Sequence, residues 1–253
     1  MIEGKLLQVS QVKLPVGYTA EDVRKACIRK LKINDNEILA YETKKKSIDA
    51  RKKDDIHYSL SVVVSLTDKA YSRIISARRP IPDVAVYKEE KLEIKRITKT
   101  DDKMRPVIVG SGPAGLFCAY VLALSGLKPI IIEQGQDVER RNATVDKFWE
   151  TGELSETTNV QFGEGGAGTF SDGKLNTMVK DPYRRIPFVL ETFVKFGADP
   201  EILYINKPHI GTDVLKNILI NMRKEILSLG GEYRFETKFT DFEAKKGNIS
   251  HIV

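Results

Sequence analysis

A glycine-rich turn between a short apolar strand and an apolar helix constrains this sequence most. The turn, Gly110-Ser111-Gly112-Pro113-Ala114-Gly115, follows residues 107–109 and opens a helical segment that ends near Ser125. In such a turn, the first glycine permits the tight bend and the second admits a phosphate close to the backbone. The third glycine lets the helix pack on the strand. A second strand, residues 130–132, then delivers Glu133. The sequence therefore predicts a strand–helix–strand unit that binds a dinucleotide.

Glu133 and Gln134, which follow the second strand, are predicted to contact this dinucleotide. A carboxylate at the tip of the second strand accepts hydrogen bonds from the adenosine ribose hydroxyls. It also repels a 2′-phosphate, so the sequence disfavours NADP at this turn. Arg141 lies a few residues further along, and it has two readings. It either pairs with the pyrophosphate or lies on a solvated helix face.

A second glycine cluster follows, at residues 163–168. Four glycines in six residues do not form a stable helix or strand cheaply, but they let the backbone approach a ligand closely. The alternative reading is a surface loop. We expect a second set of cofactor contacts here, formed by Gly165, Gly166, Ala167, Gly168 and Thr169.

The first turn, with Ala119, Gly126 and Glu133, resembles the FAD-binding fingerprint of flavoproteins with glutathione-reductase-like Rossmann domains. Residues 159–175 and 207–213 are similar to the FAD-dependent, or NAD(FAD)-utilising, dehydrogenases, and the resemblance covers nearly the whole chain. It implies FAD as the cofactor, oxidoreductase activity, and NAD(P)H as a candidate electron donor. It implies no substrate and no catalytic residue. Within this resemblance, Lys174 is either a stabiliser of the reduced flavin or a surface lysine.

The sequence divides into two parts of different character. Residues 1–82 are predicted to form a small basic α+β module, which ends at Pro80-Ile81-Pro82. Residues 83–104 form an extended connector. Residues 105–253 form an α/β domain of the Rossmann type. Because the chain stops at Val253, in a predicted strand, we expect this domain to lack a further parallel strand and to belong to a longer enzyme.

The elements of the module follow from local patterns. Thr19 and Asp22 have capping-box spacing, which predicts the start of a helix. Apolar residues alternate in β-strand fashion over two segments and recur at helical spacing between them. The predicted order is a strand at 5–14, a helix from Thr19, a strand near 38–42, a strand at 56–66 and a helix to about Arg78.

Charge is unevenly distributed along the chain. Residues 1–105 contain 24 Lys/Arg and 16 Asp/Glu, a net charge of +8, whereas residues 106–253 contain 17 and 19, a net charge of −2. A basic module suits nucleic acid, but no known reading motif accompanies the charge, so a solvated surface is the favoured interpretation. An RNA-associated flavoprotein is therefore one alternative function. A truncated fragment that holds no flavin is another.

Other sites have little support in the sequence. Cys27 and Cys118 are too few for a disulfide framework or a zinc site. The three histidines are scattered. His57 is expected to be exposed, and His209 is expected to have a structural role. No signal peptide and no apolar run of about 20 residues is present, which predicts a cytoplasmic protein.

Overall fold

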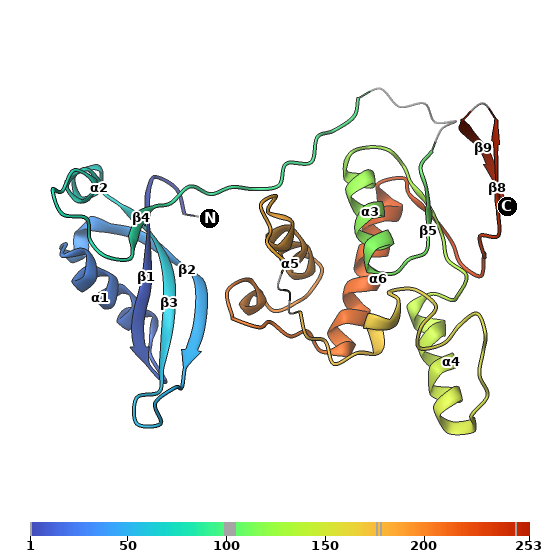
Figure 1. Ribbon diagram of the computed structural model, residues 1–253, viewed down its shortest axis with the longest axis horizontal. Coiled ribbons are helices and arrows are strands. Elements are labelled where there is room, and N and C mark those ends of the chain that lie inside the picture. The colour runs from blue at the N-terminus through green and yellow to red at the C-terminus, as the bar shows by residue number, and fades with distance from the viewer. Residues whose placement is uncertain (1, 99–104, 176, 178, 246) are drawn as a thin grey trace. The chain divides into compact units, whose positions relative to one another are not determined.

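The structure is a computed structural model that describes residues 2–98, 105–175, 177, 179–245 and 247–253. The chain folds into two compact units (Figure 1). The first unit contains Met1–Lys91 and Glu201–Pro208, and the second contains Leu92–Pro200 and His209–Val253. The chain is mixed α/β and contains a parallel sheet, as its sequence predicts.

The first unit is a four-stranded antiparallel sheet with two α-helices. The strand order is β2-β3-β1-β4, and the chain runs in βαββαβ order, which is the split-βαβ arrangement. Its elements are β1 (Lys5–Pro15), α1 (Ala20–Leu31), the 3₁₀ turn Asp35–Glu37, β2 (Ile38–Asp49), β3 (His57–Leu66), α2 (Asp68–Ile75) and β4 (Val84–Val86).

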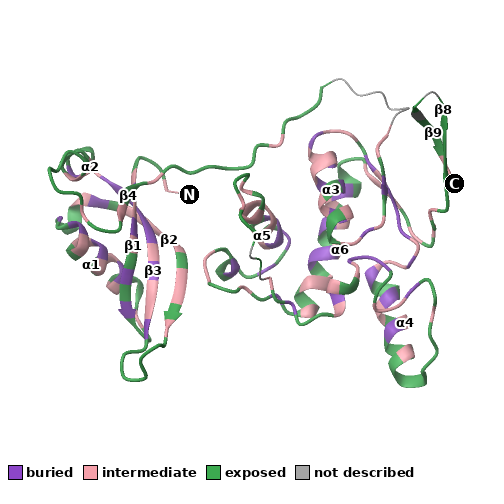
Figure 2. Cartoon of the chain, viewed as in Figure 1, coloured by how far each residue is buried: buried purple, intermediate pink, exposed green. Residues whose placement is uncertain are grey.

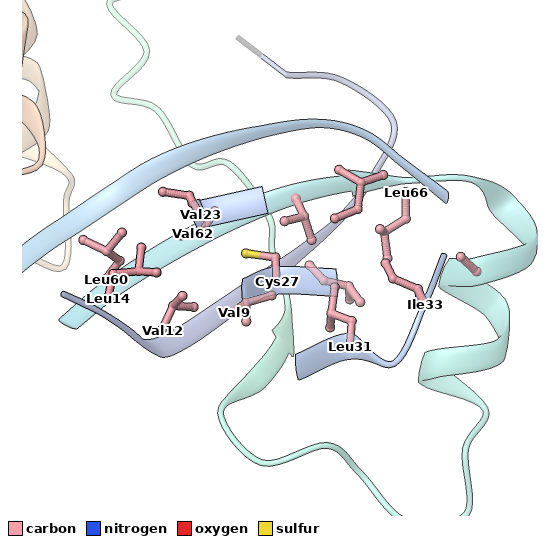
Figure 3. Close-up of a cluster of buried hydrophobic side chains, with 14 residues drawn as sticks. Val9, Val12, Leu14, Val23, Cys27, Leu31, Ile33, Leu60, Val62 and Leu66 are labelled. Atoms are coloured by element: carbon pink, nitrogen blue, oxygen red, sulfur yellow. The ribbon is translucent and has the colours of Figure 1, made fainter. Parts of the chain in front are cut away.

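The apolar residues at strand spacing and those at helical spacing pack together in one core (Figure 3). Helix α1 begins with the predicted capping box between Thr19 and Asp22 and buries residues at helical spacing. A bulge in β1 at Gln11, which has a φ of 53°, shifts the register between Val9 and Val12. Both halves of the strand therefore face the same core. The core includes Leu7, Val9, Val12, Leu14, Val23, Cys27, Leu31, Leu60, Val62, Val64 and Leu66.

Strand β2 is longer than predicted and includes the basic run Lys44–Lys46. It bulges twice where it pairs with β3. Its outer edge is also paired, because the Lys46 N–H donates to the carbonyl of Tyr204 and the Asn206 N–H donates to the carbonyl of Lys46. This second partner compensates for the low β-propensity of lysine.

The expectation that His57 is exposed is wrong. Its relative exposure is 8%, because the loop between β2 and β3 folds back over the imidazole. Nδ1 lies 3.0 Å from the carbonyl oxygen of Asp55, and Nε2 lies 3.9 Å from a carboxylate oxygen of Asp49. The alternation of β3 begins at its first residue, but the loop covers the face that the sequence assigns to solvent.

The second unit contains a three-stranded parallel sheet in the order β5-β6-β7 and an antiparallel hairpin, β8–β9. Helix α3 packs on β5 and β6, and α6 packs on β7. The elements are β5 (Val107–Val109), α3 (Pro113–Leu124), β6 (Ile130–Ile132), α4 (Val138–Thr151), the 3₁₀ turn Ala167–Phe170, α5 (Arg185–Lys195), α6 (Thr212–Ser228), β7 (Glu232–Arg234), β8 (Phe242–Lys245) and β9 (Asn248–Ile252). A further 3₁₀ turn, Pro200–Leu203, lies where the chain passes into the first unit.

Helix α3 approaches its strand very closely at Gly115. The helix buries Leu116, Ala119 and Ala123 and exposes the opposite side (Figure 2). A Cβ atom added to Gly115 would overlap the carbonyl oxygen of Gly110 and lie 3.3 Å from a methyl group of Ile108. The third glycine of the turn is therefore required by packing within the protein.

We expect Gly115→Ala to lower the free energy of unfolding by roughly 2 kcal/mol or more, because helix α3 must move away from β5. Urea denaturation monitored by circular dichroism is the measurement. Gly168→Ala is the matched control, since an added Cβ meets no atom within 4 Å there. Equal stability of the two variants would contradict the packing requirement.

Candidate functional site

The glycine-rich turn ends in an open helix N-terminus. Gly110 has a φ of 90°, which favours glycine, and Gly112 is the N-cap of α3, followed by Pro113 at the first helical position. The N–H groups of Ala114 and Gly115 have no acceptor inside the helix. A Cβ atom added to Gly112 would meet no protein atom within 4 Å. The turn therefore leaves space for an anion beside unpaired N–H groups.

Glu133 braces this turn from the end of β6. It is 5% exposed, and its Oε2 accepts hydrogen bonds from the Ser111 N–H at 2.8 Å and the Ser111 hydroxyl at 2.9 Å. Its Oε1 accepts from the Gly135 N–H at 3.0 Å. The sequence predicts a ribose contact for Glu133, whereas in the structure its carboxylate accepts hydrogen bonds from the glycine-rich turn and holds that turn in place.

The second glycine cluster lies against the first turn. The Gly165 N–H donates to the carbonyl of Ser111 at 2.9 Å. A Cβ atom added to Gly166 would lie 3.3 Å from the Cα of Gly112 and from the Cδ of Pro113. The two segments, which are 54 residues apart at Ser111 and Gly165, therefore share one surface, and a side chain at Gly166 would crowd the backbone of Gly112.

Arg141 lies inside the protein, which corrects the reading that placed it on a solvated helix face. The side chain is 0% exposed. Its guanidinium donates to five backbone carbonyl oxygens at 2.6–3.2 Å, those of Asn159, Val160, Gly163, Glu164 and Gly166. Desolvation lowers the pKa of Arg141 to about 10, so the group is still charged at neutral pH. Arg141 thus shapes the second glycine cluster from inside.

Glu164 is a second buried charge in the same loop. Its Oε2 accepts from the Val138 N–H, at the start of α4, at 2.8 Å and lies 3.2 Å from the guanidinium of Arg223. Its Oε1 has no hydrogen-bond partner among the residues that the structure describes. Burial raises the pKa of Glu164 to about 7 despite the arginine.

A cavity of about 320 Å³ opens at the carboxyl ends of the three parallel strands, where ligands bind in α/β sheets. Five of its lining residues belong to the predicted cofactor set: Gly110, Gly112, Glu133, Gln134 and Gly166. The other lining residues are Val109, Ile132, Gln161, Phe162, Gly163, Thr237, Lys238 and Phe239. None of these eight residues belongs to the predicted set, although the position of the last three after the third parallel strand is a usable signal.

Ten predicted residues do not line this cavity: Ser111, Pro113, Ala114, Gly115, Arg141, Gly165, Ala167, Gly168, Thr169 and Lys174. Thr169 is fully buried, and its hydroxyl lies 3.5 Å from the carbonyl oxygen of Glu164. Lys174 is exposed and forms an ion pair with Asp172 at 2.7 Å. Lys174 therefore does not contact the cavity, and its exposure agrees with the alternative reading of a surface lysine.

Comparison with known proteins agrees with the position of this site. Residues 108–144 match the family model for an NAD(P)-binding Rossmann-like domain. Residues 7–65 match the model for a domain of unknown function (DUF8436). The Rossmann match covers β5, α3 and β6 and reaches into α4, so the second unit contains a Rossmann-like nucleotide-binding domain.

Two relatives extend this picture. The chain is 41% identical over 247 residues to an uncharacterized protein of Clostridium beijerinckii, which covers 98% of this chain but 45% of that relative. It is 33% identical over 63 residues to the glutamate synthase [NADPH] small chain of Halomonas elongata, which covers 25% of this chain and 13% of that protein. The chain thus spans less than half the length of either relative.

No described helix is both long enough and apolar enough to cross a membrane. Among the described residues, no group of three or more His, Cys, Asp or Glu side chains could hold a metal ion.

We expect the stability of the protein to fall as pH rises from about 4.5 to 7, relative to Glu164→Gln. The unfolded chain ionises Glu164 near its ordinary pKa of 4.5, whereas the folded chain retains the proton to about 7. Folding is therefore penalised progressively over this window, by on the order of 3 kcal/mol once both states are ionised.

Urea denaturation of both proteins from pH 5 to pH 8 measures this difference. Glu153→Gln is the control, because it removes an exposed carboxylate that pairs with Lys147. Its stability difference from the unaltered chain should vary far less over the range. A constant difference for Glu164→Gln as well would show that burial does not perturb Glu164.

Proposed function

We propose that this chain binds FAD and forms part of an FAD-dependent oxidoreductase. The observation that supports this best is the close approach of Gly166 to Gly112 beside a cavity at the carboxyl ends of parallel strands. A dinucleotide needs both features, since its pyrophosphate must lie against bare backbone at a helix N-terminus. In flavoproteins that resemble this chain, a glycine-rich segment after the second strand lies along FAD.

The residues present fit the ADP half of such a cofactor. Gly112 and the first turn of α3 would hold the pyrophosphate, and Glu133 would accept bonds from the ribose hydroxyls. Three of the four lone-pair positions of its carboxylate are occupied by protein donors, so one is left for a ribose. Phe162 and Phe239 line the same cavity and offer apolar surface to an adenine ring.

When bound, FAD supplies the hydride chemistry, and the protein supplies binding and orientation. Arg141 and Glu133 have the clearest parts in this division, because they fix the two backbone segments that would hold the pyrophosphate. The carboxylate of Glu133 also disfavours a 2′-phosphate at this site. Because FAD would occupy this site, NAD(P)H as the electron donor requires a separate position, and the substrate is a small molecule whose class the chain does not specify.

We expect Gly112→Val to abolish flavin retention, with affinity lowered at least about 100-fold, because the new side chain occupies the space that the pyrophosphate needs. Stability of the flavin-free protein should change by no more than about 1 kcal/mol, since the Cβ position is free of protein atoms. Flavin absorbance after purification and urea denaturation are the two measurements. Flavin retention equal to that of the unaltered chain would rule out the proposed pyrophosphate position.

Glu133→Gln and Glu133→Ala should separate the two roles of this carboxylate. Glutamine retains an acceptor for Ser111, whereas alanine leaves buried N–H and O–H donors unpaired, at a cost of about 1–3 kcal/mol each. We expect Glu133→Gln to fold and to bind FAD roughly 10-fold more weakly, and Glu133→Ala to be destabilised as well. Titration calorimetry and thermal melts distinguish these outcomes. Unchanged affinity in Glu133→Gln would mean that the ribose is held elsewhere.

A further inference from the structure

A basic groove lies in the first unit, between the carboxyl ends of its two helices and the loop that follows α2. Its volume is about 710 Å³. Its floor includes Leu31, Ile74, Pro80, Ile81 and Pro82, and its polar lining is five cations and one carboxylate, namely Arg29, Lys30, Lys32, Arg73, Arg79 and Asp83. We call this set the α1–α2 groove.

Three of the five cations are not neutralised. Lys30 is paired with Asp83 at 3.2 Å, and Arg73 is paired with Glu37 at 2.9 Å. Arg29, Lys32 and Arg79 are exposed, and their side chains form no hydrogen bond or ion pair to any residue within the described ranges. The groove therefore presents an unbalanced positive charge to solvent.

The groove also accounts for most of the charge of its unit. Met1–Lys91 and Glu201–Pro208 together contain 20 Lys/Arg and 14 Asp/Glu, a net charge of +6. Five cations and one carboxylate give the groove +4. Five of the unit's 20 Lys/Arg therefore lie in this groove with one carboxylate, and the other cations are distributed over the rest of the unit.

Helix electrostatics explain only part of this concentration. Arg29 and Lys30 lie in the last turn of α1, where cations are stabilised by the helix dipole. Arg79 lies four residues beyond the end of α2, past the reach of its dipole, and Lys32 is the left-handed C-cap of α1. The dipoles of α1 and α2 therefore do not require a cation at Arg79.

The centre of the open face of the sheet is polar. Sheets of four strands that bind RNA on this face use exposed aromatic side chains to stack bases. Here the centre of the face contains Gln8, Ser10 and Ser61, which hydrogen-bond to one another at 2.8–3.3 Å. These three side chains cannot stack bases, so we expect the cations of the groove to be the main contacts for a polyanion.

We propose that the α1–α2 groove binds the phosphate backbone of a single-stranded nucleic acid without reading its bases. The guanidinium groups of Arg29 and Arg79 and the ammonium of Lys32 each contact a phosphate, and the concave floor accommodates the backbone between them. The contact is independent of the dinucleotide site of the second unit.

The test uses fluorescein-labelled 20-nucleotide RNA and DNA of the same mixed sequence, with the full chain, in fluorescence anisotropy from 50 to 200 mM KCl. Three phosphate contacts predict a slope of log K against log salt of about −2, and therefore a loss of affinity of about 20-fold over this range. RNA and DNA should bind about equally, because no contact involves the ribose 2′-hydroxyl.

The Arg29→Ala, Lys32→Ala, Arg79→Ala triple variant should bind RNA at least about 10-fold more weakly at 50 mM KCl and lose most of the slope. The matched control is the Arg51→Ala, Lys52→Ala, Lys53→Ala triple variant. It removes the same charge from the β2–β3 loop, which lies at the opposite end of the sheet from α2 (Figure 1). The control should weaken binding less than about 3-fold.

Three outcomes would overturn the proposal. Equal weakening in both triple variants would mean that only net charge attracts the RNA. No binding at 50 mM KCl would exclude a nucleic acid site. Binding to vesicles with 30% phosphatidylserine, without binding to RNA, would assign the groove to a membrane surface. Far-UV circular dichroism of each variant verifies the fold, and flavin titration of each shows separately whether the dinucleotide site is unaffected.

Discussion

The candidate site depends on a buried arginine whose side-chain hydrogen bonds, among the residues that the structure describes, all go to backbone carbonyl oxygens. Arg141 donates to five carbonyl oxygens between Asn159 and Gly166, which lie on a loop with little regular structure. Burying a guanidinium is costly, and removing carbonyls from water is costly too. Each group satisfies the other here, so a glycine-rich segment that would otherwise be conformationally free is held in one shape. The hydrogen bonds from Arg141 therefore also fix the position of this segment against Gly112.

The same principle extends outward from Arg141. The side chain of Glu164, from the same loop, accepts a hydrogen bond from the N–H of Val138 at the start of α4. Arg223 of α6 forms ion pairs with both Glu164 and Glu139. On the other side, Glu133 satisfies the N–H groups of Ser111 and Gly135. Buried backbone groups in irregular segments need such partners, because no helix or sheet ladder supplies them. Charged side chains thus replace secondary structure around the cavity.

Local patterns predicted the parts of the fold that local physics determines. The turn at Gly110, the helix start at Thr19 and the alternation of β3 depend on neighbours in sequence, and each appears as expected. Tertiary contacts decided the rest. The burial of His57 and the return of Glu201–Pro208 to the edge of β2 depend on segments distant in sequence or folded back, and no periodicity records them.

The site shows the same division between local and distant information. Gly112 and Glu133 were predicted to contact the cofactor, and both line the cavity. Arg141 was assigned to a ligand because its charge is visible in the sequence, whereas the carbonyls that it satisfies are not. Thr237, Lys238 and Phe239 reach the cavity through the loop after β7, more than 100 residues from the turn. Only the parallel register of three strands brings these segments together.

Two glycines of one turn show how the structure separates folding from binding. Gly115 is required by the protein, because a side chain there would overlap Gly110. Gly112 is not, because its Cβ position is empty and its φ of −66° is open to any residue. Glycine at such a position gains no packing and costs backbone entropy on folding. A ligand that lies against the backbone gives a physical reason for that glycine, and the helix N-terminus beside it selects an anion.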